Sequence, residues 1–146
     1  MKEKNMLKTN QPDELEIFAK TLYGEARGES LSGIEAVANV IINRHKMALL
    51  NNRTWWGKTI IEICLKPQQF SCWNPTDPNF KLLQQDLSDD KIYAICKRIA
   101  LRALHGNLPD NTHGATHYHA IHINPYWARG IIPSAQIGNH LFYALS

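Results

Sequence analysis

A nearly all-apolar run of helical length dominates the first third of the chain and constrains its fold most strongly. The apolar residues of this run cover most of a helical wheel: Ile34, Val37, Ala38, Val40, Ile41 and Ile42. A helix that is apolar on nearly every side is buried, so the rest of the chain must pack around it. Ser32 and Glu35 have the spacing of a capping box and predict its start. Asn39, Asn43 and Arg44 are its polar exceptions.

A shorter amphipathic segment precedes this run and ends in an acidic, glycine-containing stretch, Tyr23–Glu29. Apolar residues from Leu15 to Ala26 recur at helical spacing, and Gly28 is expected to end the helix. Glu25 falls at the edge of the apolar stripe. A carboxyl group in such a position can be held protonated and act as a proton donor. Glu25 is therefore the candidate catalytic acid.

Length and composition indicate one globular domain. The chain has 146 residues, of which 44% are hydrophobic and 20% are charged. We expect a polar, flexible lead-in over residues 1–10 and a single domain over residues 11–146. Three cysteines without a close pair argue against a disulfide framework and a cysteine zinc site. The net charge of +3 suits a polyanionic partner but is too small to identify one.

The remaining segments predict an α+β architecture. Residues 47–58 read as a loop, residues 59–65 as a short helix and residues 68–79 as irregular chain. Ser88 is expected to cap a well-defined helix that ends near Gly106. Two later runs, residues 114–123 and 135–144, have β-like patterns and are expected to pair as antiparallel strands. The prediction is a mainly helical lobe with a small antiparallel sheet from the C-terminal third.

Two chemistries remain open on the residues alone. Cleavage of a sugar chain needs one protonated carboxyl group, and hydrolysis usually adds a second carboxylate, for which Glu29 is the nearby candidate. The histidines between residues 113 and 122 suggest zinc, but the sequence contains no HExxH helix and we expect no metal. Loop aromatics permit stacking on sugars or on single-stranded nucleic acid. Because Lys and Arg do not cluster between these aromatics, single-stranded nucleic acid is the less favoured ligand.

Several motifs, taken in chain order, resemble the SleB-like cell-wall hydrolases, a family named for a spore-cortex-lytic enzyme. The matching pieces extend over nearly the whole chain: Leu22-Tyr23-Gly24-Glu25-Ala26-Arg27-Gly28-Glu29, Ala36-Val37-Ala38-x-Val40-Ile41-x-Asn43-Arg44, Gln69-Phe70-Ser71, Gly114-Ala115-Thr116-His117-Tyr118, Trp127-Ala128 and Ile137-Gly138-x-His140-x-Phe142-Tyr143. The resemblance implies a lysozyme-like domain with a glycan groove and Glu25 as its essential acid. It also implies substrate-binding roles for Glu29, Gln69, Phe70, Ser71, Thr116, His117, Tyr118 and Trp127.

The resemblance further implies a peptidoglycan-degrading enzyme that cuts the glycan strand after N-acetylmuramic acid. A lytic transglycosylase forming 1,6-anhydro ends is the leading expectation, and it needs no second carboxylate. The alternatives are a muramidase, a zinc-dependent N-acetylmuramoyl-L-alanine amidase and a non-enzymatic wall-binding module. We expect no cofactor, no nucleic-acid partner and a monomer.

The N-terminus shows no classical signal peptide. Its basic residues precede no apolar stretch of signal length, and no apolar run is long enough to span a bilayer. We therefore expect synthesis in the cytoplasm and action on the cell wall after release or export by an unusual route.

Overall fold

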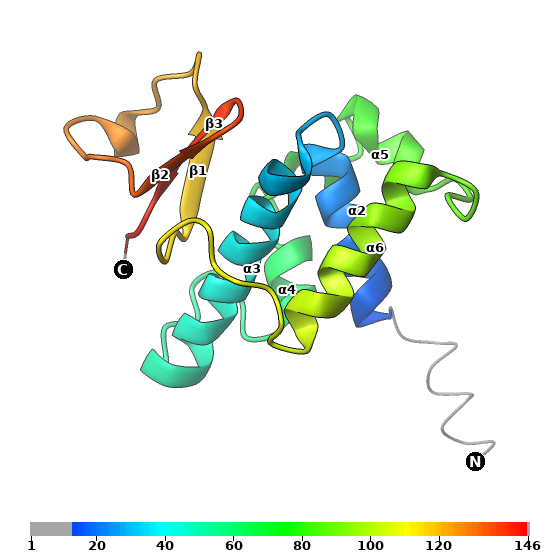
Figure 1. The fold of residues 1–146 in the computed structure, drawn as a ribbon, viewed down its shortest axis with the longest axis horizontal. Helices are drawn as coiled ribbons and strands as arrows, with labels where there is room; N and C mark the ends of the chain where they lie inside the picture. Colours follow the sequence, from blue (N-terminus) through cyan, green and yellow to red (C-terminus); the bar gives the residue numbers. More distant parts are fainter. Residues whose placement is uncertain (1–12, 146) are drawn as a thin grey trace.

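The computed structural model describes residues 13–145, so the predicted lead-in over residues 1–10 lies outside the described residues. These residues contain five α-helices and a three-stranded antiparallel sheet (Figure 1). The helices are α2 (Glu14–Ala26), α3 (Leu31–Asn51), α4 (Ile60–Leu65), α5 (Pro78–Leu83) and α6 (Lys91–Leu104). The strands are β1 (His117–Ala120), β2 (Ala135–Ile137) and β3 (His140–Tyr143), and short 3-10 turns lie at Ser71–Trp73 and Tyr126–Ala128. The α+β prediction is confirmed.

Local capping decides where the helices begin. The Asp13 side chain accepts a hydrogen bond from Leu15 N and caps α2. The predicted capping box at Ser32 and Glu35 is wrong, because Ser30 has the extended backbone of a cap and accepts from Gly33 N. Glu35 instead pairs with Arg102 of α6 at 3.3 Å.

Three other predicted boundaries are also wrong. Asp90, not Ser88, caps α6, because its carboxylate accepts from the backbone N–H groups of Ile92 and Tyr93. Helix α3 continues to Asn51, so the loop expected from residue 47 begins later. The expected irregular segment contains the start of α5, which Asp77 caps and Pro78 opens.

Helix α3 lies between the sheet and the other helices (Figure 1). One side of α3, including Ile34, Val37 and Ile41, joins the large core of the helical lobe. Another side of α3, with Ala36 and Val40, forms a second core with Ala115, which precedes β1, and with Phe142 of β3. Burial on both sides explains why this helix is apolar around most of its circumference, as the sequence predicts.

The sheet has the strand order β1–β3–β2. Strand β3 pairs antiparallel with β1, with His117 opposite Tyr143, and with β2, with Ile137 opposite His140. The predicted second β-run is thus two strands joined by the tight turn Gly138–Asn139. Gly138 has a φ of +56°, which suits the first central position of such a turn.

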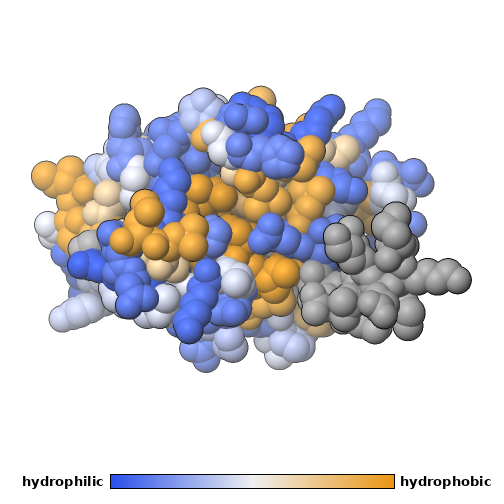
Figure 2. All heavy atoms as spheres, turned by 90° about the horizontal axis from the view of Figure 1, so that it is seen from below, coloured by the Kyte–Doolittle hydropathy of each residue, from blue (hydrophilic) through white to orange (hydrophobic). Residues whose placement is uncertain are grey.

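The outer surface carries apolar side chains as well as polar ones. Seen from below, an apolar band crosses the middle of the molecule between polar groups (Figure 2). Leu49, Leu50 and Trp55, at and after the end of α3, are among the exposed apolar side chains. Within residues 13–145, no helix has both the length and the apolar character needed to cross a membrane.

Candidate active site

Glu25 lies in the last turn of α2, where its side chain is half-buried at the junction of the helical lobe and the sheet. Its two carboxylate oxygens each accept one hydrogen bond. The Tyr118 hydroxyl, from β1, donates to Oε1 at 3.0 Å. The Cys72 backbone N–H donates to Oε2 at 3.2 Å. Three segments far apart in the sequence therefore fix this one carboxyl group.

Close packing brings the Cys72 N–H to Glu25. A Cβ atom added at Gly24 would lie 2.5 Å from the Cys72 Cβ atom, so only glycine permits this approach. The next residue, Trp73, donates from its indole Nε1 to the buried Thr21 hydroxyl at 2.9 Å. The segment 70–73 is thus anchored on α2, and its aromatic Trp73 serves packing.

The Cys72 side chain does not offer a nucleophile. It is fully buried, and burial together with the neighbouring Glu25 carboxylate raises the pKa of its thiol. A thiol of raised pKa stays protonated at neutral pH, and the thiolate is the reactive form.

Two pockets flank Glu25 and share it as a wall. The first, of about 400 Å³, is lined by Glu25, Arg44, Trp56, Gln68, Gln69, Phe70, His117, Tyr118 and Trp127. The second, of about 600 Å³, is lined by Glu25, Ala26, Gly28, Glu29, Ala120, Ile121, His122, Asn139 and His140. A carboxyl group with binding space on both sides is suited to act on a bond inside a chain. We call the two pockets the arginine pocket and the hairpin pocket.

The polar exceptions of α3 hold the start of the sheet in place. Asn39 donates to Pro109 O at 3.0 Å, and Asn43 donates to Ala115 O at 2.9 Å. Arg44 Nε donates to Thr116 O at 2.8 Å. These bonds fix the segment that leads into β1, and they thereby position Tyr118 over Glu25.

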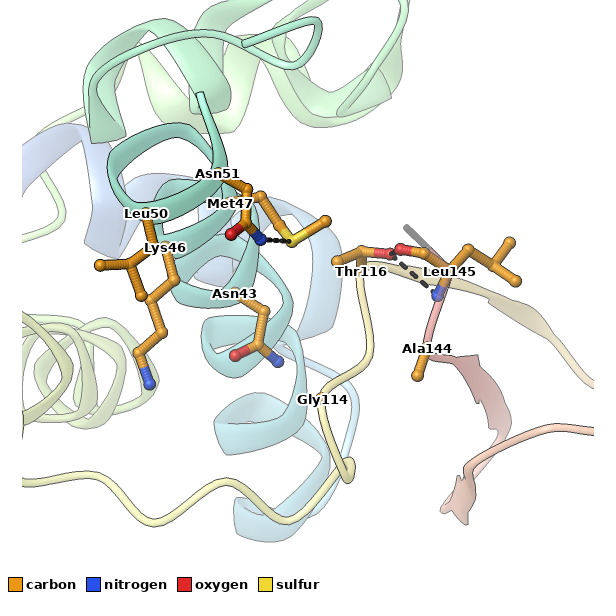
Figure 3. A pocket seen from close by; sticks show the side chains of 9 residues that line it. All are labelled: Asn43, Lys46, Met47, Leu50, Asn51, Gly114, Thr116, Ala144 and Leu145. Carbon is orange, nitrogen blue, oxygen red and sulfur yellow. Dashed lines mark hydrogen bonds between the residues drawn. The ribbon is translucent and has the colours of Figure 1, made fainter. Parts of the chain in front are cut away.

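Thr116 lies outside both pockets at Glu25, unlike the sequence-based expectation. It lines a separate pocket between the end of α3 and the last residues of the chain (Figure 3). Its hydroxyl donates to Leu145 O at 2.6 Å and accepts from Leu145 N at 3.3 Å. The hydroxyl proton is therefore engaged with Leu145 O. His117 Nδ1, which lies 2.9 Å from the Thr116 hydroxyl oxygen, must then carry a proton and donate to that oxygen. Thr116 thus sets the tautomer of a residue that does line the arginine pocket.

His117 is neutral in the folded protein. Burial, and secondly the charge of Arg44, lower the pKa of His117 to about 4. Its ring packs against Trp56 and Trp127 at centroid distances of 5.7 and 5.2 Å. The arginine pocket therefore has a partly aromatic wall that can pack against an apolar sugar face.

Glu29 lines the hairpin pocket, but its oxygens contact the hairpin. Oε1 accepts from Asn139 N at 3.2 Å and lies 3.4 Å from His140 Nδ1. Oε2 accepts from Asn139 Nδ2 at 3.4 Å. A Cβ atom at Gly138 would lie 2.8 Å from Oε1, so glycine lets the turn approach this carboxylate. Glu29 thus joins the end of α2 to the sheet.

The structure brings most of the predicted site residues together. Around Glu25 lie Glu29, Gln69, Phe70, His117, Tyr118 and Trp127. Ser71 and Thr116 line neither pocket. Among residues 13–145, no group of three His, Cys, Asp or Glu side chains could hold a metal ion.

Two elements of the candidate site were not identified as such from the sequence. Arg44 was noted as a polar exception of its helix and as part of a family motif, but it was given no role, although its position on an otherwise buried helix was a usable signal. The Cys72 backbone N–H has no side-chain signature, so no residue pattern could have identified it.

We expect Tyr118→Phe to slow the reaction about 10- to 100-fold with little loss of stability. The change removes one donor to a carboxylate, a bond worth about 1.5–3 kcal/mol, and keeps the ring stacked on Phe142. Steady-state rates and thermal unfolding would measure the two effects. Tyr143→Phe is the matched control, since that hydroxyl contacts His119. Equal losses in both variants would contradict the assigned role of Tyr118.

Residues 28–143 match the family described as Cell Wall Hydrolase, a range that begins just after Glu25. The spore cortex-lytic enzyme of Halalkalibacterium halodurans is 31% identical over an alignment of 141 residues, and the match covers 89% of this chain and 34% of that protein. The chain thus spans about a third of the length of this relative.

Two solved structures are similar over 92% of the chain, each with a TM-score of 0.63 and 26% identity. One is the catalytic domain of the germination-specific lytic transglycosylase SleB from Bacillus anthracis, of which 98% is covered. The other is the catalytic domain of the Bacillus cereus SleB protein, of which 93% is covered. By the family match over most of its length, the chain belongs to the cell wall hydrolase family.

Proposed function

We propose that the protein cleaves the glycan strand of peptidoglycan after N-acetylmuramic acid, as a lytic transglycosylase with Glu25 as its acid and base. The observation that carries the proposal is the position of Glu25 between two pockets, with one donor on each carboxylate oxygen. The similarity to SleB catalytic domains supports the same chemistry.

In the first step, the Glu25 carboxyl group donates its proton to the glycosidic oxygen. The bond from that oxygen to C1 of the muramic residue breaks, and positive charge develops on the sugar. The carboxylate that remains is stabilised by the Tyr118 hydroxyl and the Cys72 N–H. Preorganised donors of this kind stabilise a developing charge at no cost of reorganisation.

In the second step, the same carboxylate takes the proton from the C6 hydroxyl of the muramic residue. O6 then bonds to C1 and closes the 1,6-anhydro ring, which returns Glu25 to its protonated form without consuming water. One carboxyl group therefore completes the cycle.

The contacts of Glu29 favour this single-carboxylate route over hydrolysis. A hydrolase needs a second carboxylate that is free to act on water or on C1. Both Glu29 oxygens accept hydrogen bonds from Asn139 of the β2–β3 hairpin, one from its backbone N–H and one from its side-chain amide. Glu29 is therefore a positioning residue in this proposal.

Digestion of purified peptidoglycan, with mass spectrometry of the soluble products, tests the proposed function. We expect muropeptides with 1,6-anhydro-muramic ends, which are lighter by one water than the reducing products of a muramidase. Reducing ends would replace the transglycosylase assignment with hydrolysis. Free peptides would indicate an amidase, and release of no product would leave a binding module.

A further inference from the structure

Arg44 is a buried cation that forms no ion pair within the described part of the chain. Its side chain is 7% exposed. Nε donates to Thr116 O at 2.8 Å, and Nη1 donates to Gln69 Oε1 at 3.2 Å. Both acceptors are neutral, and none of the ion pairs among residues 13–145 involves Arg44. A guanidinium has five N–H donors, so three of them have no acceptor in the described part of the chain.

The guanidinium is held firmly and remains charged. It lies over the rings of Trp56 and Phe70, at 5.4 Å from each centroid. Burial lowers the pKa of Arg44 to about 10, so the group is still cationic at neutral pH. A buried charge without an opposite partner is costly, and such groups are normally paired. The energetics thus point to a partner that arrives from outside the protein.

The Arg44 side chain reaches the arginine pocket. Arg44 lines that pocket together with Glu25. Its third nitrogen, Nη2, makes no hydrogen bond within the described residues and is not fully buried. The other titratable groups of the lining are Glu25, the neutral His117 and Tyr118, whose pKa is raised by burial. When Glu25 carries its catalytic proton, Arg44 is the sole charge in the pocket lining. A planar anion fits this site, because the guanidinium fork matches carboxylate geometry.

We propose that Arg44 binds a carboxylate of the muramic residue and thereby sets the direction of the glycan strand in the groove. This inference rests on the proposed function. N-acetylmuramic acid carries a lactyl carboxyl group, free or extended by a stem peptide with its own carboxylates, whereas N-acetylglucosamine carries neither. The muramic residue then occupies the arginine pocket, and the sugar on the leaving side occupies the hairpin pocket. Glu25, which both pockets share, faces the bond between them.

Binding measurements on the Glu25→Gln variant separate recognition from cleavage. Three strand preparations of equal length are compared: peptide-free strands with free lactyl carboxylates, the same strands with each carboxylate converted to its methylamide, and strands that keep their stem peptides. We expect the free-carboxylate strands to bind about tenfold more tightly than the methylamides, as for one charge-assisted contact. Adding Arg44→Gln should reduce this ratio to about one, and Arg44→Lys should retain part of it.

Arg98→Gln is the matched control, because it removes one positive charge from an exposed position on α6. It should leave the ratio unchanged. If the peptide-bearing strands bind as tightly as the free-carboxylate strands and Arg44→Gln weakens both, the carboxylate comes from either source. If only the peptide-bearing strands depend on Arg44, the stem peptide supplies it.

The proposal would be overturned if the carboxylate and methylamide strands bound with equal affinity and Arg44→Gln did not weaken the binding of the peptide-bearing strands. A loss of affinity for all three strand types in Arg44→Gln would show that Arg44 acts only by holding Thr116 and Gln69. Neither result would affect the proposed cleavage, which the product analysis tests on the wild-type protein. Conversely, absence of cleavage would reject the proposed function while the binding ratio still reports on Arg44.

Discussion

Replacing Glu25 with Gln should lower the rate of glycan cleavage by at least about 10³-fold while the protein keeps its fold. Glutamine preserves the size of the side chain: its carbonyl oxygen can accept from the Cys72 N–H, and its NH2 group can donate to the Tyr118 hydroxyl oxygen. It cannot release a proton, and general acid–base catalysis is worth about 10²–10⁴-fold for each step that uses it. Release of anhydro-muropeptides measures the activity, and circular dichroism with thermal unfolding checks the fold.

Two matched variants make this result specific. Glu16→Gln changes an exposed carboxylate on the same helix, which pairs with Lys20, and should cleave normally. Glu29→Gln weakens the contacts to the hairpin and should lower the unfolding temperature more than the catalytic rate. Normal cleavage by Glu25→Gln would reject Glu25 as the acid. A loss of turnover in a stable Glu29→Gln protein would instead indicate a hydrolase with two carboxylates.

Gly24→Ala should reduce both activity and stability strongly, although alanine is normally the better helix former. The new methyl group would meet the Cys72 Cβ and Sγ atoms at 2.5 and 2.7 Å, inside a packed core. Overpacking of this kind costs about 1–3 kcal/mol. Relief requires the segment 70–73 to move away from α2, which withdraws the Cys72 N–H from Glu25. We expect cleavage to fall about 10- to 100-fold, as measured by initial rates at a temperature where the variant is folded.

Gly28→Ala is the control for an added methyl group, because Gly28 follows the end of α2 and a Cβ atom there meets nothing within 4 Å. It should be neutral or slightly stabilising. The double variant Gly24→Ala, Cys72→Gly removes both clashing atoms and should recover part of the activity, because the backbone N–H at position 72 can return. If Gly24→Ala alone kept full activity, the close approach of the two segments would not matter for catalysis.

The helical part of the fold was predictable where periodicity and burial agree. The apolar run around Val37 identified a buried central helix, and its two-sided burial explains the pattern. Boundaries were less predictable, because Ser30 and Ser32 are chemically equal candidates for the same cap. Only the backbone conformation and the bond from Gly33 N select Ser30. The missed helix α5 did carry a signal, in the order Asp77-Pro78.

The candidate site was predictable where the type and position of a side chain indicate its chemistry. Glu25 stood out because an acid at the edge of an apolar stripe is unusual, and the structure places it between the two pockets. Thr116 could not be placed correctly, because the direction of its hydroxyl depends on Leu145, which lies 29 positions later in the chain. The role of Arg44 depends on a backbone carbonyl 72 positions later, which no local pattern encodes.

Helix α3 contributes to two cores, and this has a mechanical consequence for the two pockets at Glu25. Among the described residues, the core beneath the sheet contains four buried residues, Ala36, Val40, Ala115 and Phe142, and the core of the helical lobe is much larger. The free energy that resists separation of the two lobes is therefore set by the smaller core and by the hydrogen bonds of Glu29, Asn39, Asn43 and Arg44 to the sheet and the segment before it. Tyr118 moves with one lobe and Glu25 with the other, so the carboxylate loses a donor whenever this seam opens.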